Sequence, residues 1–342
     1  MKTLKEGQRE LNEVKEALQM KIIRIVSVIM LVFTLVFAVA GCAPKTAKYP
    51  SKSINLIIQA GAGGLSDTVA RTVASELQNI LGVPVVCANK TGASGAVAMG
   101  YVEGSSPDGY TIGYVPVEMS MLKGLGYADI EPSNFDLIAR ANIAQATITV
   151  KADAPWKTLE EFVDYAKKNP GKINVGNSGT GSIWHIAAAS FEKIAGVKFN
   201  HIPFDGAAPA VAALMGGHVD AVPVSVSEVI SGVKSGQLRI LGIMDSERSP
   251  IFPDVPTLKE KGYDLTVAAW GGFATPKGIP QEVKDVLYPA FEKAIKSDSL
   301  KKIADERGFS VAYLPSDGFA KFAQEQFDFY IKMLPELGIT KK

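Results

Sequence analysis

The chain of 342 residues contains little cysteine, little histidine and almost no net charge. It has two cysteines and three histidines, and its 36 basic residues stand against 35 acidic ones. This balance gives no electrostatic reason to expect nucleic acid as a partner. The three histidines, His185, His201 and His218, lack the paired spacing of a zinc site. We therefore predict neither a metal nor another cofactor.

Motifs for nucleotide binding are also missing. The chain has no Gly-Lys-Ser/Thr of a phosphate-binding loop, and Ser66 stands where a dinucleotide fingerprint would need a glycine. No fixed-period repeat or low-complexity tract occurs either, which argues against a solenoid.

An apolar stretch near the N-terminus, Ile25 to Ala40, follows Lys21 and Arg24 and ends in Gly41-Cys42. It resembles a bacterial lipoprotein signal peptide, in which the cysteine is lipidated and becomes the new N-terminus. An uncleaved transmembrane helix over residues 22–40 is the alternative, but the small residues before Cys42 favour cleavage. We therefore predict that residues 1–41 are a signal peptide. We also predict that the mature protein is extracytoplasmic and lipid-anchored to the bacterial cell membrane, at the cell surface or in the periplasm.

The first 19 residues are charged and precede Met20, after which an ordinary signal peptide begins, so we predict that translation starts at Met20. Residues 42–51 form the predicted lipidated tether. The leader holds six basic and four acidic residues, which leaves 30 against 31 and a mature charge of about −1. With Cys42 lipidated, Cys87 has no disulfide partner within one mature chain.

The remaining length, about 300 residues, suits two domains.

Strands and helices alternate along the mature chain. In the first block, β-prone runs cover residues 54–58, 83–88 and 110–114, and helices are predicted from Ser66 or Asp67 to Leu81 and over 93–102. This order predicts a parallel sheet with covered faces. A second alternating block begins near Lys151, with a capping box at Thr158 to Glu161, strands over 173–175, 219–224 and 238–243, and a helix over 182–195. After Pro276 the chain is predicted to be helical.

Three small-residue turns lie between a predicted strand and a predicted helix. The first, Ala60 to Asp67, combines glycines with the free N–H groups and positive dipole end of the following helix, an arrangement that binds anions. A plain tight turn with Ser66 or Asp67 as N-cap is the alternative.

The second turn, Gly176 to Ser182, offers hydroxyls and amides that could surround a carboxylate without a cation. It fails as a hydrolase elbow, because Thr180 occupies the final glycine position of Gly-x-Ser-x-Gly. Nearby His185 is predicted to be a packed helix residue rather than a base. The third turn, Pro203 to Pro209, contains Asp205 and Gly206, and a simple strand-to-helix connection is its alternative interpretation.

Taken together, six segments in order resemble the solute-binding proteins of tripartite tricarboxylate transporters, the Bug or TctC family. The resemblance covers essentially the whole mature chain and rests on residues 61–71 (GAGGLSDTVAR), 89–95 (NKTGASG), 107–111 (PDGYT), 176–182 (GNSGTGS), 203–207 (PFDGA) and 269–273 (AWGGF).

This resemblance implies an α/β fold of the two-domain periplasmic-binding-protein type (type II), with a ligand cleft between domains joined by two crossover segments. Residues 52–150 and 275–342 would form one domain and residues 151–274 the other, with crossings near Thr149 to Pro155 and Ala269 to Pro276. It implies a receptor, not an enzyme, that captures a small organic acid and delivers it to a two-component membrane permease. A di- or tricarboxylate or an aromatic acid is expected as ligand, and the receptor is expected to be a monomer.

The family's ligand-binding loops fall on twelve positions of this chain. Carried over by position they are Gly63, Gly64, Leu65, Ser66, Asp67, Ser178, Gly179, Thr180, Gly181, Ser182, Asp205 and Gly206. The chain departs from many relatives at Gln59 to Ala62, where a proline and an aromatic residue are common, and at Leu65, which is usually Gly, Ser or Thr. Two other functions remain as alternatives: an extracytoplasmic serine hydrolase using Ser178 or Ser182 with His185, and a ligand-binding sensor not coupled to transport.

Overall fold

The computed structural model describes residues 7, 15–16, 18–27, 30 and 48–340. The chain divides into two compact units, Met1–Lys48 and Tyr49–Lys342. In the first unit residues 18–27 are helical. None of the helices formed by the described residues has the length and apolar character needed to cross a membrane. Cys42, the predicted cleavage site and most of the apolar stretch lie outside the described residues.

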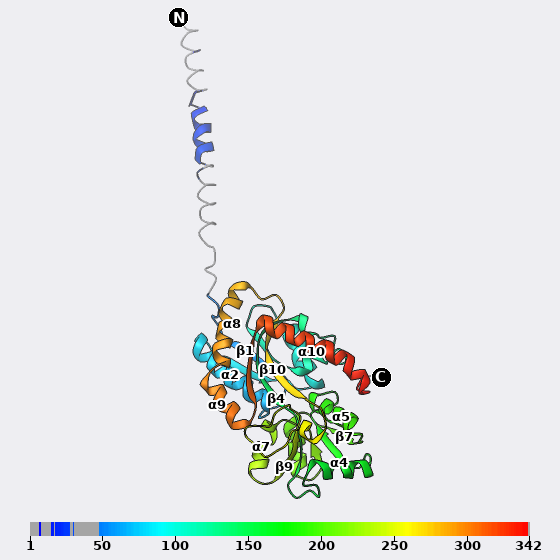
Figure 1. The fold of residues 1–342 in the computed structure, drawn as a ribbon. Coiled ribbons are helices and arrows are strands. Elements are labelled where there is room, and N and C mark those ends of the chain that lie inside the picture. Colours follow the sequence, from blue (N-terminus) through cyan, green and yellow to red (C-terminus); the bar gives the residue numbers. More distant parts are fainter. Residues whose placement is uncertain (1–6, 8–14, 17, 28–29, 31–47, 341–342) are drawn as a thin grey trace. The chain divides into compact units, whose positions relative to one another are not determined.

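The second unit, Tyr49–Lys342, contains two mixed β-sheets with helices on their faces (Figure 1). The first sheet has the strand order β11 (Ser310–Pro315), β4 (Phe135–Gln145), β10 (Ala268–Pro276), β3 (Thr111–Pro116), β1 (Ile54–Ile58) and β2 (Val85–Asn89). The second has the order β7 (Asn200–Pro203), β6 (Asn174–Asn177), β8 (Ala221–Val222), β5 (Thr147–Lys151) and β9 (Leu238–Ile243).

Side-chain alternation in β1 divides the core around the first sheet. Leu56 and Ile58 pack in one cluster with α2 (Leu65–Leu81), α8 (Gln281–Ile295) and α9 (Asp298–Arg307). Ile57, between them, points into a second cluster with α3 (Ala96–Glu103) and α10 (Ser316–Glu336). Both faces of this sheet are therefore covered, as its apolar strands require.

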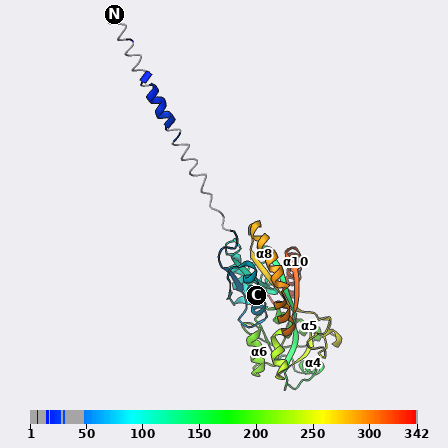
Figure 2. The ribbon, with the colours of Figure 1, turned by 90° about the vertical axis from the view of Figure 1, so that its left-hand side faces the viewer.

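The helices of the second sheet are α4 (Leu159–Lys168), α5 (Ile183–Ala195), α6 (Ala207–Met215) and α7 (Val226–Lys234), several of which are visible in Figure 2. Short 3-10 turns occupy η1 (Ala93–Gly95), η2 (Val117–Ser120), η3 (Pro132–Asn134) and η4 (Lys259–Lys261).

Several predicted elements are confirmed nearly to the residue. Helix α2 buries Val69, Val73 and Leu77 and ends at Gly82, whose φ of 70° is the left-handed conformation expected of a glycine stop. Helix α4 begins after Thr158, and both halves of the predicted capping box are present.

The predicted parallel arrangement of the first three strands is confirmed, but the sheet that contains them is mixed. Strands β1, β2 and β3 are parallel, but β10 pairs antiparallel with both β3 and β4, and β11 pairs antiparallel with β4. The second sheet is mixed as well, since β5 runs antiparallel to β8 and β9. The predicted helical tail is also interrupted by β11.

The chain passes between the sheets earlier than predicted in both places. Strand β4 of the first sheet ends at Gln145 and β5 of the second begins at Thr147, so Ala146 is the first passage. Its N–H donates to Val267 O and its carbonyl accepts from Met244 N, which joins it to the returning segment ahead of β10. Thr149 to Lys151 and Ala269 to Pro276, predicted as parts of the crossings, lie within β5 and β10 instead. The division into two domains stays a prediction.

Asp136 joins the C-terminal segment to β4. Its Oδ2 accepts hydrogen bonds from the N–H groups of Gly278 (2.9 Å) and Ile279 (3.1 Å) and lies 3.2 Å from Lys284 Nζ. Burial by itself would raise the pKa of Asp136, but these donors outweigh it and hold the pKa below its usual value.

We expect Asp136→Asn to lower the free energy of unfolding at pH 7 by about 1–3 kcal/mol, the range for charge-assisted hydrogen bonds. Because the folded-state pKa is depressed, this contribution is present above the unfolded-state pKa near 4 and is lost as the pH falls through the folded value. Urea unfolding at pH 7 and at pH 3 measures both points. Asp129→Asn, at an exposed pair with Lys123, is the control and should change stability by less than about 0.5 kcal/mol. An Asp136→Asn effect of equal size at both pH values would contradict this account.

Candidate functional site

A cavity of about 430 Å³ lies where the carboxyl ends of the parallel strands of the two sheets meet. Its wall is built mainly from the segments that follow β1, β2 and β3 of the first sheet and β6, β7 and β8 of the second, with further residues from β4 and β10. Eight of the twelve predicted site residues line it: Leu65, Ser66, Ser178, Gly179, Thr180, Ser182, Asp205 and Gly206. Gly63, Gly64, Asp67 and Gly181 do not.

The start of α2 presents free hydrogen-bond donors at this cavity. Gly64 is the N-cap, with extended backbone (φ −76°, ψ 179°) and no side-chain cap. Within residues 48–340, no group accepts a hydrogen bond from the amides of Leu65 or Ser66, the first two residues of the helix. Ser66 Oγ is itself held by Gln59 Nε2 at 2.9 Å. The positive end of the α2 dipole and two amides are thus available to an anion.

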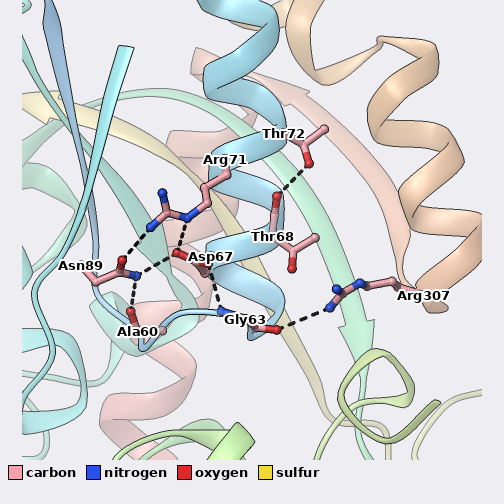
Figure 3. Close-up of polar contacts among 8 residues, drawn as sticks. All are labelled: Ala60, Gly63, Asp67, Thr68, Arg71, Thr72, Asn89 and Arg307. Atoms are coloured by element: carbon pink, nitrogen blue, oxygen red, sulfur yellow. Dashed lines mark hydrogen bonds and ion pairs between the residues drawn. The ribbon is translucent and has the colours of Figure 1, made fainter. Parts of the chain in front are cut away.

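Asp67 stands behind this loop and shapes it (Figure 3). Its Oδ2 accepts from Gly63 N at 3.0 Å, and its Oδ1 accepts from Arg71 Nε and Asn89 Nδ2, each at 2.9 Å. Burial acts to raise the pKa of Asp67, but these donors together lower it, so the side chain is ionised at neutral pH. Arg71 forms an ion pair with Asp67 and does not line the cavity.

The second predicted loop has fewer free amides than its sequence indicated. Gly179 N donates to Asn177 Oδ1, and Gly181 N donates to His185 Nδ1, both at 3.0 Å. Ser182 N donates to Gly179 O. Of the loop residues 178–182, only Ser178 and Thr180 have amides without an acceptor among the described residues.

The same loop contacts the first-sheet side of the cavity. Thr180 O accepts from Ser94 Oγ at 3.2 Å and from Tyr127 Oη at 2.9 Å. At Gly181, with a φ of 77°, an added Cβ would lie 2.5 Å from a methyl of Leu125. Gly181 therefore permits close packing with Leu125 and lies outside the cavity wall.

The third loop leads into α6, whose N-cap Gly206 has a φ of 117° and makes no side-chain cap. Ala207, the first helical residue, lines the cavity. Its amide also has no acceptor among the described residues. Asp205 is exposed at the cavity.

Two more donors in the wall come from buried side chains. Asn142 is 1% exposed and Trp270 is 3% exposed, and neither Asn142 Nδ2 nor Trp270 Nε1 has a partner in the described part of the chain. Asn142 Oδ1 accepts from Tyr114 Oη at 2.8 Å. Gly271 leaves room for this pair, since a Cβ there would lie 1.7 Å from Tyr114 Oη.

The wall contains no Lys, Arg or His among the described residues, but it contains two glutamates that our sequence analysis missed. Glu118 lies in η2, just after β3, and its Oε1 accepts from Ile183 N of α5 at 3.1 Å. Glu228 lies in the first turn of α7, and its Oε2 accepts from Ser225 N and Ser225 Oγ, both at 3.0 Å.

Both glutamates are partly accessible through the cavity and otherwise surrounded by protein. Burial raises the pKa of Glu118, despite the hydrogen bond from Ile183 N. Burial also raises the pKa of Glu228 to about 7, with the Glu118 charge adding to the effect and the Ser225 and Trp184 hydrogen bonds opposing it. A sequence signal existed for Glu228, because Ser225-x-x-Glu228 is a capping box, but that motif predicts only a helix start.

The serine-hydrolase alternative would need a hydrogen bond between a serine hydroxyl and the His185 ring, and neither Ser178 nor Ser182 makes one. His185 Nδ1 accepts from Gly181 N, and Ser182 Oγ accepts from His185 N as the N-cap of α5. Burial lowers the pKa of His185 to about 4, with His201 adding to the effect, so the ring is neutral at pH 7. His185 therefore fixes the loop, as a packed helix residue.

Comparison with known proteins identifies the relatives of this chain. Residues 69–339 match the tripartite tricarboxylate transporter family receptor. A UPF0065 protein of Cupriavidus necator is 33% identical over 299 residues, which are 86% of this chain and 90% of the relative. A TctC solute-binding protein from Polaromonas, solved without ligand, has a TM-score of 0.65 and 39% identity over 84% of this chain and 99% of its own. MatC from Rhodopseudomonas palustris, solved with bound malate, has a TM-score of 0.77 and 26% identity over 83% of this chain and 99% of its own.

These matches agree with the fold and the cavity described above. The similar structures are solute-binding proteins and not enzymes, and they share the α/β architecture of periplasmic binding proteins. The chain accordingly belongs to the receptor family of the tripartite tricarboxylate transporters, the Bug or TctC family.

Proposed function

We propose that this protein is an extracytoplasmic receptor that captures a small organic carboxylate and delivers it to a two-component membrane permease of the tripartite tricarboxylate type. The observation that carries this proposal is the start of α2 at the cavity, where the amides of Leu65 and Ser66 are free. The α6 start at Ala207 adds a third free amide. The malate bound by the related MatC supports the same ligand class.

The energetics suit a carboxylate. A buried carboxylate needs donors for its lone pairs, since otherwise the cost of desolvation exceeds the gain from binding. Charge-assisted hydrogen bonds stabilise a complex by roughly 1.5–3 kcal/mol each, so three to four of them approach the roughly 8 kcal/mol of a micromolar complex after ordering costs. The donors of α2, α6 and the Asn142 amide supply that number without a cationic side chain.

The ligand class is tested on the purified mature protein by thermal shift. We expect at least one acid from a panel of di- and tricarboxylates, including malate and citrate, and of aromatic acids to raise the unfolding midpoint in proportion to the logarithm of its concentration. Native mass spectrometry of protein taken straight from expression identifies any acid carried through purification. If neither these acids nor other carboxylates, amino acids included, move the midpoint, the proposal loses its basis.

The role of the α2 amides is tested by removing one N–H and keeping the helix. Proline is accepted at the first helical position, and the extended backbone of Gly64 suits the residue before a proline. We expect Leu65→Pro to weaken acid binding by about 10- to 150-fold, equivalent to roughly 1.5–3 kcal/mol. Leu65→Ala, which loses the same side chain but keeps the amide, is the matched control in calorimetric titration. Equal affinities of the two variants would show that this amide does not hold the ligand.

We also propose that the receptor is anchored by lipid on Cys42. The prediction rests on the sequence Gly41-Cys42 behind the apolar stretch. In a bacterial host, the wild-type chain should fractionate with membranes and carry the added mass of acyl chains on its N-terminal peptide. Cys42→Ser should abolish that mass, whereas Cys87→Ser should leave it unchanged. An unmodified Cys42 in the mature protein would contradict the anchor and leave the binding proposal untouched.

A further inference from the structure

The Glu118 and Glu228 carboxyls are the feature of the cavity that a simple carboxylate receptor does not explain. Both line the wall, and none of the other described residues in the wall is a Lys, Arg or His. Their hydrogen bonds come from neutral donors, Ile183 N for Glu118 and the Ser225 N–H and hydroxyl for Glu228. Neutral donors satisfy lone pairs but do not cancel charge, so ionisation of both carboxyls leaves negative charge that a cationic group of a ligand could balance.

The rest of the wall suits a cation at this place. Five aromatic side chains line the cavity: Tyr114, Tyr127, Trp184, Phe204 and Trp270. The face of an aromatic ring attracts an ammonium group, most strongly when the ring is a tryptophan and water is excluded. The Trp184 side chain also acts to lower the pKa of Glu228, which indicates an aromatic ring close to one of the two acids.

Donors for an anion are present in the same cavity. The Asn142 amide is 1% exposed, and its Nδ2 has no acceptor within residues 48–340. Trp270 Nε1, on a side chain 3% exposed, has none either. With the free amides of Leu65 and Ser66, the wall contains a set of unused donors together with the partly buried pair Glu118 and Glu228 and the exposed Asp205.

We propose that the ligand is a zwitterion, a small carboxylate that also carries a cationic nitrogen, with its carboxylate on the α2 amides and its nitrogen between the Glu118 and Glu228 carboxyls. The inference rests on the proposed function, because it identifies the chemical group at the other end of the same ligand, away from its carboxylate. It assigns a substrate class, ω- or α-amino acids and their methylated derivatives, in place of simple di- and tricarboxylates.

Matched isosteres test the charge of the nitrogen directly. In 4-aminobutyrate and pentanoate an ammonium replaces a methyl group at constant length, and glycine betaine and 3,3-dimethylbutanoate differ only by nitrogen for carbon. Glutarate adds the diacid of similar length. We titrate these, and the shorter and longer members of each series, into the wild-type protein and follow Trp184 and Trp270 by intrinsic fluorescence. We expect at least one zwitterion to bind 10-fold or more tightly than both its neutral isostere and the corresponding diacid.

The variants Glu228→Gln and Glu118→Gln remove one charge each and keep the size of the side chain. We expect each to weaken the zwitterion at least 10-fold and to change binding of the neutral isostere less than 3-fold. Glu306→Gln, on an exposed residue of α9 outside the cavity wall, makes the same change in net charge and is the control. Glu118 also bonds to Ile183, so circular dichroism and the unfolding midpoint of each variant are measured first. The wild-type isostere comparison decides the question even if a variant fails to fold.

The pH dependence of binding gives a readout that a structural role of Glu228 would not produce. Because the pKa of Glu228 is raised to about 7, the free protein holds it mostly protonated at pH 5.5 and mostly ionised at pH 8.5. The neighbouring tyrosines Tyr114, Tyr127 and Tyr330 have pKa values that burial raises further above this range. Asp205 is the other carboxyl in the cavity wall, where it is exposed. Zwitterion affinity should therefore increase with pH by about 10- to 30-fold across this interval, and Glu228→Gln should flatten the profile.

The outcomes separate the two proposals. Tighter binding of diacids or neutral monoacids than of zwitterions, or an affinity that falls with rising pH, overturns the zwitterion and leaves the carboxylate receptor standing. A diacid would gain from protonated Glu228 as a donor, which gives the opposite pH slope. If neither acids nor zwitterions bind at any length, the proposed function itself fails. Preference for the zwitterion together with loss in Glu228→Gln supports both.

Discussion

The site depends on one geometric constraint, which is that all the parallel strands of both sheets end at the same cavity. Six segments that follow β1, β2, β3, β6, β7 and β8 line it, and most of them lead directly into a helix. Each helix start carries unsatisfied N–H groups and the positive end of a dipole. Their convergence in one small volume creates a surplus of donors, and the chain has to supply acceptors or leave the donors for a ligand.

The chain supplies acceptors at two of these helix starts and leaves the donors free at two others. Glu118 accepts from Ile183 N at the start of α5, and the Ser225 hydroxyl and Glu228 form the capping box of α7. At α2 and α6 the N-caps are Gly64 and Gly206, which have no side chain to accept a hydrogen bond. Glycine at these two positions has no side chain that could accept from the helix amides, which keeps those donors free.

Local patterns in the sequence predicted much of this arrangement. The stripe of Val69, Val73 and Leu77 fixed α2 and placed the glycine-rich loop at its start, and Thr158 with Glu161 located α4. The antiparallel members of the first sheet were missed because β4 and β10 show no clear apolar alternation and their partners are far away in sequence. Both strands are largely buried, but β4 includes polar residues such as Asp136, Arg140 and Asn142, and β10 is rich in small residues. Asp67 was predicted to bind ligand, but its carboxylate is turned to Gly63 and Asn89, a contact over 22 residues that no local motif indicates. The site residues themselves still await a test by binding.

The position of the acids explains how a wall without cations can contain them. Glu118 and Glu228 lie at the starts of α5 and α7, where helix dipoles favour negative charge. A carboxylate placed there lowers the potential at those two helix starts and has no such contact with α2 or α6. The cavity is therefore polarised between helix starts where a backbone amide donates to a protein carboxylate, at α5 and α7, and helix starts whose amides are free, at α2 and α6. In such a cavity the anionic group of a ligand has a preferred place even though no lysine or arginine marks it, because repulsion from the two glutamates and attraction by the free amides favour the same orientation.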